Sequence, residues 1–393
     1  MPYGRPDPLS GNLPDPLREP SFYAGVAPKR ALAWVVDMGV TWLLCLVALP
    51  STAFTGLFWW ATLWACVDFL YRWATLSTGS STWGMRLMAI CLRERDGRPL
   101  SAVTALLHTA GYTASLAVFP LLLGSVVLTR FDLWPIALVL AALAALVWER
   151  DRLGFGVLGL AVAAKLFPAV LVPLALSLVW QRRGRREALV CLGVLAGVVA
   201  LVYLPFVVLG ADGVAYSLGR QLGRPLQIES LGSALFLAAH HLFGLEIEMR
   251  SGHGSQNLAG AGPAVVATLL TAAQLGVLAW IWLQRPRNGE ELIRWSAAAL
   301  LAFVALGKVL SPQFLIWLAP LVPLVAGRRG LRAAVLLGVA LVLTQLWFPA
   351  RYWELALEFD GVASGLVLAR DLVLVAVLVA LLSRSERVPA RSP

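Results

Sequence analysis

Long apolar stretches separated by short arginine-rich segments dominate this sequence, and this alternation constrains the fold more than any other feature. A helix needs about 20 apolar residues to cross a bilayer, and the stretches are long enough for around ten such helices. Only 14% of the residues are charged, against roughly 25% in soluble domains, which leaves too little polar surface to cover a soluble globule. The sequence therefore predicts an all-α polytopic integral membrane protein. It excludes a disordered chain and, despite a net charge of +10, a soluble protein that binds nucleic acid.

The basic residues predict how the chain is threaded through the bilayer. Lys and Arg in short loops mark the cytoplasmic side. With residues 1–30 inside, most of the basic residues fall in cytoplasmic loops. The sequence thus predicts a multi-pass protein of the cell membrane with both termini cytoplasmic. About 11 spans are expected, from the apolar ranges 31–50, 57–76, 102–128, 133–148, 187–209, 263–284, 333–347 and 363–383 together with two broken pairs of short helices at 154–180 and 292–326.

The two broken pairs follow from charge and from proline. A single helix over 154–180 would carry the basic segment 181–186 to the outside, against the charge rule. Pro168 and Pro312 favour a break, because proline removes a backbone donor and disfavours helix in the residue before it. The chain has only three lysines, and two of them, Lys165 and Lys308, stand at these bends.

Lys165 and Lys308 are candidate ligands for an anion at the outer leaflet. A cation at membrane depth is costly unless it reaches the interface or meets an anion. One interpretation is that the two ammonium groups hold a phosphate. The other is that they extend to the interface and cap short helices, and the sequence leaves both open.

Several outer residues have the chemistry of a site for hydroxyl compounds. Asp132 and Glu229 are candidate general bases, although Asp132 could instead pair with Arg130 at a helix end, and Glu229 could be a solvated loop acid. The polar segment around His253 suits hydroxyl binding or a flexible loop. Arg370 and Asp371 interrupt the last predicted span, where charge marks function or pairing between helices. Asp37, Asp68 and Arg72 are explained by pairing between the first two spans.

Metal-binding and cofactor motifs are absent from the sequence. The four cysteines show no paired spacing and the four histidines form no zinc motif, so no metal site is predicted by motif and no cofactor is expected, while the sequence leaves open whether a divalent metal takes part. Residues 1–28 contain seven prolines and are expected to form a disordered cytoplasmic tail, and residues 384–393 a basic cytoplasmic tail.

Residues 25–115 resemble the RDD family of membrane domains. The resemblance rests on residues 28–30, on Asp37, and on the segments 81–88 and 95–101, in which Asp96 precedes Gly97. It implies that Arg30, Asp37 and Asp96 correspond to the residues behind the family name. The closing segment of that family is missing, so residues 29–117 are taken as an incomplete RDD-like domain. Such domains have been linked to transport.

From about residue 120 the chain resembles glycosyltransferase family 87, a group of multispan enzymes of the GT-C superfamily. The matching segments are 128–135, 163–168, 224–230, 253–257 and 307–313. The resemblance implies a GT-C-like region over 118–383 that takes mannose from a polyprenyl phosphate, with Lys165 and Lys308 facing the lipid phosphate. The residues expected to bind substrate beside these lysines are Arg130, Arg224, His253, Gln256, Asn257, Gln313 and Arg370.

One feature departs from the resemblance. The GT-C superfamily carries its catalytic aspartate on the first outer loop, and here that loop, residues 51–56, contains no acid. The two partial resemblances meet near residues 115–122, which suggests a fusion of incomplete parts with Asp132 or Glu229 as substitute base. The first hypothesis is transfer of a hexose, mannose by resemblance, from a polyprenyl phosphate to a lipid-linked or glycan acceptor at the outer face. The alternative is a non-catalytic RDD-type transport or accessory protein, or an inactive fusion.

Overall fold

The computed structural model describes residues 26–52, 55, 60–94, 96–123 and 130–383. The chain divides into two compact units, residues 1–121 and 122–393. Both predicted tails lie mainly or entirely outside the described residues, and so does half of the acid-free segment 51–56. The described part is mostly helical, as expected, with one short hairpin of two strands.

In the part that the structure describes, the first unit is built from four helices. They are α1 (Val26–Ala48), α2 (Trp60–Gly79), α3 (Trp83–Leu87) and α4 (Ala102–Leu123), with a 3-10 turn at Leu49–Thr52. Helix α3 packs against α1 so closely that a Cβ at Gly84 would lie 2.1 Å from the backbone oxygen of Ala33. The expected pairing of charges is confirmed: Arg72 lies 2.9 Å from Asp68 and 3.6 Å from Asp37.

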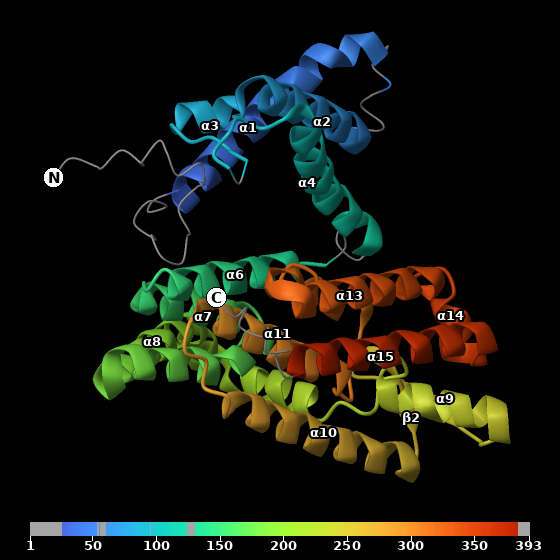
Figure 1. Cartoon of the computed structure of the whole chain (residues 1–393). Coiled ribbons are helices and arrows are strands. Elements are labelled where there is room, and N and C mark those ends of the chain that lie inside the picture. Colours follow the sequence, from blue (N-terminus) through green and yellow to red (C-terminus); the bar gives the residue numbers. More distant parts are fainter. Residues whose placement is uncertain (1–25, 53–54, 56–59, 95, 124–129, 384–393) are drawn as a thin grey trace, which may run out of the picture. The chain divides into compact units, whose positions relative to one another are not determined.

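The second unit packs its helices around the buried helix α11. Its elements are α6 (Leu133–Val147), α7 (Asp151–Ala164), α8 (Val172–Leu222), α9 (Leu231–Phe243), β1 (Glu248–Gly252), β2 (Ser255–Ala259), α10 (Ala261–Trp282), α11 (Gly289–Ala305), α12 (Leu315–Leu318), α13 (Gly327–Trp347), α14 (Tyr352–Glu358) and α15 (Gly361–Leu382) (Figure 1). Residues 297–302 of α11 are completely buried. Helix α7 packs against both α6 and α8, and helix α15 packs against both α13 and α11.

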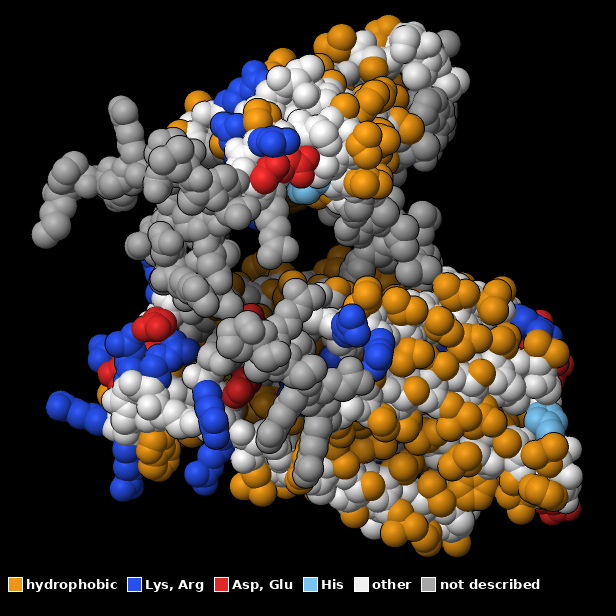
Figure 2. All heavy atoms as spheres, in the orientation of Figure 1, with side chains coloured by type: hydrophobic (Ala, Val, Ile, Leu, Met, Phe, Trp, Pro, Cys, Tyr) orange, Lys and Arg blue, Asp and Glu red, His pale blue; other side chains and the backbone are white. Residues whose placement is uncertain are grey.

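Apolar side chains cover much of the visible surface of the second unit (Figure 2). Within the described residues, five helical segments are long and apolar enough to cross a membrane: Leu32–Thr52, Phe167–Leu222, Ala261–Trp282, Gly327–Trp347 and Gly361–Leu382. Exposed Leu and Val side chains on these helices, such as Leu269 and Val335, are disfavoured by water and suit the interior of a bilayer. This supports a membrane protein, although the expected count of about 11 spans is not reproduced by these long helices.

Both predicted bends are present. Helix α7 ends at Ala164, Lys165 is extended (φ −161°, ψ 141°), and a 3-10 turn at Phe167–Leu171 contains Pro168. In the same way α11 ends at Ala305, and the chain resumes helical turns only at Pro312. Proline sits in the first turn after each break, where its missing N–H costs nothing.

Residues 210–262, which connect the predicted spans 187–209 and 263–284, are mostly regular in structure. Helix α8 bends at Gly210 (φ −172°, ψ 66°) and continues to Leu222, because one glycine allows a kink without ending the helix. Helix α9 and the hairpin then follow. His253 and Gly254 close the hairpin as a two-residue turn, both with positive φ, which is the geometry such tight hairpins need.

Candidate functional site

Lys165 and Asp132 form an ion pair beside the first bend. The Lys165 Nζ lies 2.5 Å from Asp132 Oδ1, and the Trp317 indole N–H donates to the same oxygen. The Asp132 side chain is 1% exposed and that of Lys165 is 24% exposed. Arg130 is exposed and makes no ion pair with the residues that the structure describes, so the suggested pairing of Arg130 with Asp132 is wrong.

Aromatic rings surround this ion pair. Trp317 is stacked between Phe167 and Phe314, with ring centroids 4.0 and 4.2 Å away. The Lys165 ammonium lies 5.0 Å from the Trp317 centroid and 5.2 Å from that of Phe131. Cation–π contacts and the buried carboxylate together hold the ammonium in one place. Both bonds to Asp132 fall on Oδ1, and Oδ2 takes no hydrogen bond from the described residues.

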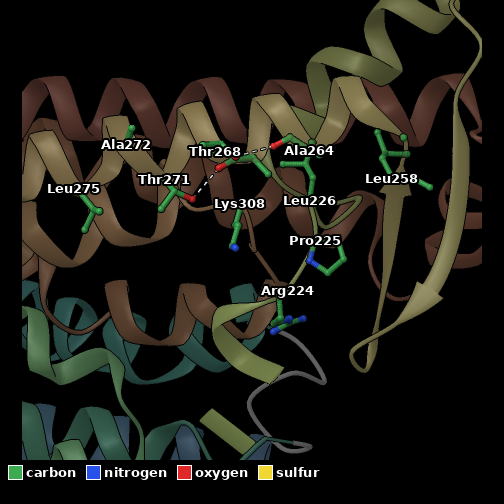
Figure 3. Close-up of a pocket in the computed structure, with 13 residues that line it drawn as sticks. Arg224, Pro225, Leu226, Leu258, Ala264, Thr268, Thr271, Ala272, Leu275 and Lys308 are labelled. Atoms are coloured by element: carbon green, nitrogen blue, oxygen red, sulfur yellow. Dashed lines mark hydrogen bonds between the residues drawn. The ribbon is translucent and has the colours of Figure 1, made fainter. Parts of the chain in front are cut away.

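A cavity of about 580 Å³ lies in the second unit, beside the second bend. Thr268, Thr271, Ala272 and Leu275 line it along helix α10, and Lys308 and Arg224 lie below them (Figure 3). The two threonine hydroxyls donate to carbonyls of their own helix, at 3.0 and 2.8 Å. The rest of the lining is largely apolar, so the free charge of the cavity comes from its two cations.

Lys308 and Arg224 are held at the cavity by short contacts. The Lys308 Nζ donates to the carbonyl of Leu222 at 2.9 Å, where helix α8 ends. Arg224 donates to the hydroxyl of Ser255 at 3.0 Å, and its Nε is buried without a partner in the described structure. Burial lowers the pKa of Arg224, a sign that its charge is poorly compensated. Neither cation forms an ion pair within the described residues.

The segment that carries Arg224 is fixed by backbone pairing on both sides. The amide of Gln227 donates to the carbonyl of Lys308 at 2.9 Å. Ile228 pairs with Gln256 of strand β2 at 3.0 Å. The hairpin and the second bend are therefore joined through residues 224–230, which sets the position of Arg224 relative to Lys308.

Glu229 is fully enclosed rather than solvated. It is 2% exposed, it accepts a hydrogen bond from the side chain of Gln227, and its Oε1 has no partner in the described structure. Burial raises its pKa to about 8. Arg370, itself completely buried, donates to the backbone oxygen of Glu229 at 2.8 Å and pairs with Asp371 at 2.7 Å. Glu229 and Arg370 thus meet, but neither lines the cavity.

The remaining predicted residues do not converge on the cavity. His253 occupies the hairpin turn, and Gln256 accepts from the hydroxyl of Ser251. Asn257 is buried and uses its amide on hairpin carbonyls, 3.0 Å from Gly252 and from Ser255. Gln313 is half-buried in the turn before α12. The Trp317 contact was missed, because an indole 185 residues away from Asp132 leaves no local signal.

These features define a class of protein. A cavity that has an apolar wall from helix α10 and is bordered by two cations, Lys308 and Arg224, suits an amphiphile that carries an anionic group. No group of three His, Cys, Asp or Glu within the described residues could hold a metal ion. The class is thus a helical membrane protein with a cavity that is bordered by cations.

Comparison of the sequence with models of known protein families identifies the family of this chain. The sequence model of glycosyltransferase family 87 matches residues 38–312, and the chain belongs to this family of membrane glycosyltransferases. The match begins well before residue 120 and overlaps the part that resembles RDD domains. It includes both bends, Arg224 and Lys308. Searches of curated proteins and of solved structures found no match.

Proposed function

We propose that this glycosyltransferase moves a hexose, mannose by the family resemblance, from a polyprenyl phosphate to a lipid-linked or glycan acceptor at the outer face of the cell membrane. The observation that carries the proposal is the cavity bordered by Lys308 and Arg224. Its volume of about 580 Å³ lies within the range of small-molecule sites. The cations would hold the phosphate, and the apolar wall of helix α10 would lie along the lipid chain.

Access from the bilayer supports a lipid donor. Leu275 lines the cavity and is 55% exposed, and α10 is one of the helices long enough to span a membrane. A lipid could therefore enter sideways without leaving the hydrocarbon. A soluble sugar nucleotide would gain nothing from an apolar wall in this position.

The reaction needs a base for the acceptor hydroxyl and positive charge beside the leaving phosphate. The acceptor oxygen loses a proton to a base and attacks the anomeric carbon, while the bond from that carbon to the phosphate oxygen breaks and the lipid phosphate leaves. Lys308 and Arg224 stabilise the charge that grows on the leaving phosphate. They are better placed for this than Lys165, whose charge is already balanced by Asp132.

Asp132 is the better of the two proposed bases. Its Oδ2 is free of hydrogen bonds from described residues. Asp132 is 1% exposed and does not line the cavity beside Lys308, so the acceptor hydroxyl would have to reach it from the side of Lys165, which is 24% exposed. Glu229, whose pKa burial raises to about 8, is mostly protonated at neutral pH, and its enclosed carboxyl does not line the cavity. We propose that Glu229 and Arg370 instead hold residues 224–230 in position, through the hydrogen bond from Arg370 to the backbone oxygen of Glu229.

The test is transfer by the purified protein in liposomes that contain polyprenyl-phosphate-mannose and a membrane-derived acceptor. Lys308→Gln and Arg224→Gln should each lower kcat/KM by about 10²-fold, the usual cost of losing one group that stabilises leaving charge. Arg250→Gln is the matched control, because Arg250 is exposed and paired with Glu248 outside the cavity. Unchanged transfer by both cavity variants would reject the phosphate role. Absence of any transfer would favour the non-catalytic alternative.

A further inference from the structure

The first unit contains a pocket of its own, about 130 Å³ in volume. Helices α1, α2 and α4 contribute its polar lining, with Arg72 at the buried end and Arg30 and His108 at the exposed rim. The space is several times what one water requires, yet too small for a nucleotide. All of its lining residues lie between residues 30 and 112, so it is separate from the cavity beside Lys308.

The acceptors that line this pocket are already occupied. Asp37 Oδ1 accepts from the Tyr71 hydroxyl at 2.7 Å and from the Gly84 amide at 2.8 Å. Its Oδ2 accepts from Thr82 at 2.6 Å and faces Arg72 at 3.6 Å. The carboxylate therefore has no capacity left for a ligand.

The hydrogen-bond donors that line this pocket, by contrast, are not all used. Arg72 is 8% exposed, and its second terminal nitrogen is buried without a partner in the described structure. The charge of Arg72 is already balanced by two carboxylates, Asp37 and Asp68, so what it can still offer a ligand is the hydrogen-bond donor that neither of them takes. Arg30 forms no ion pair within the described residues. A buried donor without an acceptor is costly, and an acceptor-rich ligand would remove that cost.

The surroundings of the pocket are apolar and exposed. Trp34 lines it and is 43% exposed, and the neighbouring Leu32 and Val35 are 56% and 60% exposed. The Tyr112 ring lies under the Arg72 guanidinium at 4.2 Å and fixes its plane. An arginine fork presented next to lipid-facing side chains matches the phosphate at a bilayer surface.

We propose that this pocket binds the phosphate group of an anionic ligand, with Arg72 as the deep donor and Arg30 closing over it. The chemistry is that of a terminal phosphate with at least three unesterified oxygens, which the headgroup of phosphatidic acid or free inorganic phosphate can supply. This site is independent of sugar transfer and remains even if the proposed donor is wrong.

The probe is phosphatidic acid added to the full-length protein in detergent, with bound lipid counted by native mass spectrometry and phosphatidylcholine as reference. Phosphatidic acid should saturate one site. Arg30→Gln should weaken it about tenfold, because a charge-assisted hydrogen bond is lost. Lys29→Gln removes an adjacent exposed charge that does not line the pocket and should bind like the unaltered protein.

Two further results separate the sources and guard against misfolding. Inorganic phosphate that displaces the lipid at millimolar concentration would identify the phosphate itself as the ligand, and failure to displace it would identify the lipid headgroup. Arg72→Lys, which keeps the charge but loses the fork, should also bind weakly while eluting as a folded species. Equal binding of phosphatidylcholine, or equal binding by Arg30→Gln and Lys29→Gln, would overturn the proposal.

Discussion

Replacing Lys165 by Met isolates the energetics of the ion pair at the first bend. The variant removes the cation that lies 2.5 Å from Asp132 Oδ1 and leaves that carboxylate in a site where it is 1% exposed. Losing one partner of a buried pair costs about 3–5 kcal/mol. Because the Trp317 N–H still bonds to the carboxylate and Lys165 is 24% exposed, we expect a loss near 3 kcal/mol.

The reverse change should cost less. Asp132→Asn leaves the ammonium with the ring faces of Trp317 and Phe131, so we expect a loss of about 1–2 kcal/mol. In the double variant the two losses should fail to add, with a coupling energy of about 2 kcal/mol. Unfolding by SDS in mixed micelles measures all three.

The control is Arg250→Gln, which breaks an exposed pair worth less than about 1 kcal/mol. A Lys165→Met protein that unfolds within 1 kcal/mol of the unaltered chain would refute the reasoning, and so would purely additive losses in the double variant.

Two other predictions concern packing and pH. Gly84→Ala should destabilise the first unit by at least about 2 kcal/mol, because its Cβ would meet the Ala33 carbonyl oxygen. Gly39→Ala, in the middle of helix α1 with open space at its Cβ, should instead stabilise by up to about 1 kcal/mol in the same unfolding assay. Glu229 keeps its proton in the folded chain up to a pKa of about 8, against 4.5 as its ordinary value, so unfolding releases a proton and stability should fall as pH rises from about 4.5 to 8. Glu229→Gln should flatten that part of the stability profile, and an unchanged slope would contradict the buried, protonated carboxyl.

Local signals in the sequence predicted much of the fold. Apolar stretches and basic loops predicted a helical membrane protein, and Pro168 and Pro312 predicted the two bends. These features are local. A proline restricts the backbone of its own turn, and whether a stretch can cross a bilayer depends on the length and composition of that stretch alone. The course of α8 beyond Gly210 was missed because a glycine allows either a kink or an end, and only packing decides.

The site was harder to predict, because its partners are far apart in the chain. Arg130 stands two positions from Asp132, yet the carboxylate pairs with Lys165, 33 residues away. A charge pattern cannot tell near neighbours in sequence from neighbours in space. Lys308 and Arg224 were both candidates, but their common cavity depends on the hairpin that residues 224–230 join to the second bend.

The central claim is that the lipid donor occupies the cavity between Lys308, Arg224 and helix α10. Photocrosslinking with a polyprenyl-phosphate-mannose analogue that carries a diazirine near its phosphate, followed by peptide mapping, tests this claim directly. We predict labelling of residues 261–282, which contain Thr268, Thr271 and Leu275, and loss of that labelling with excess unmodified donor. Specific labelling confined to residues outside the cavity lining would contradict the account.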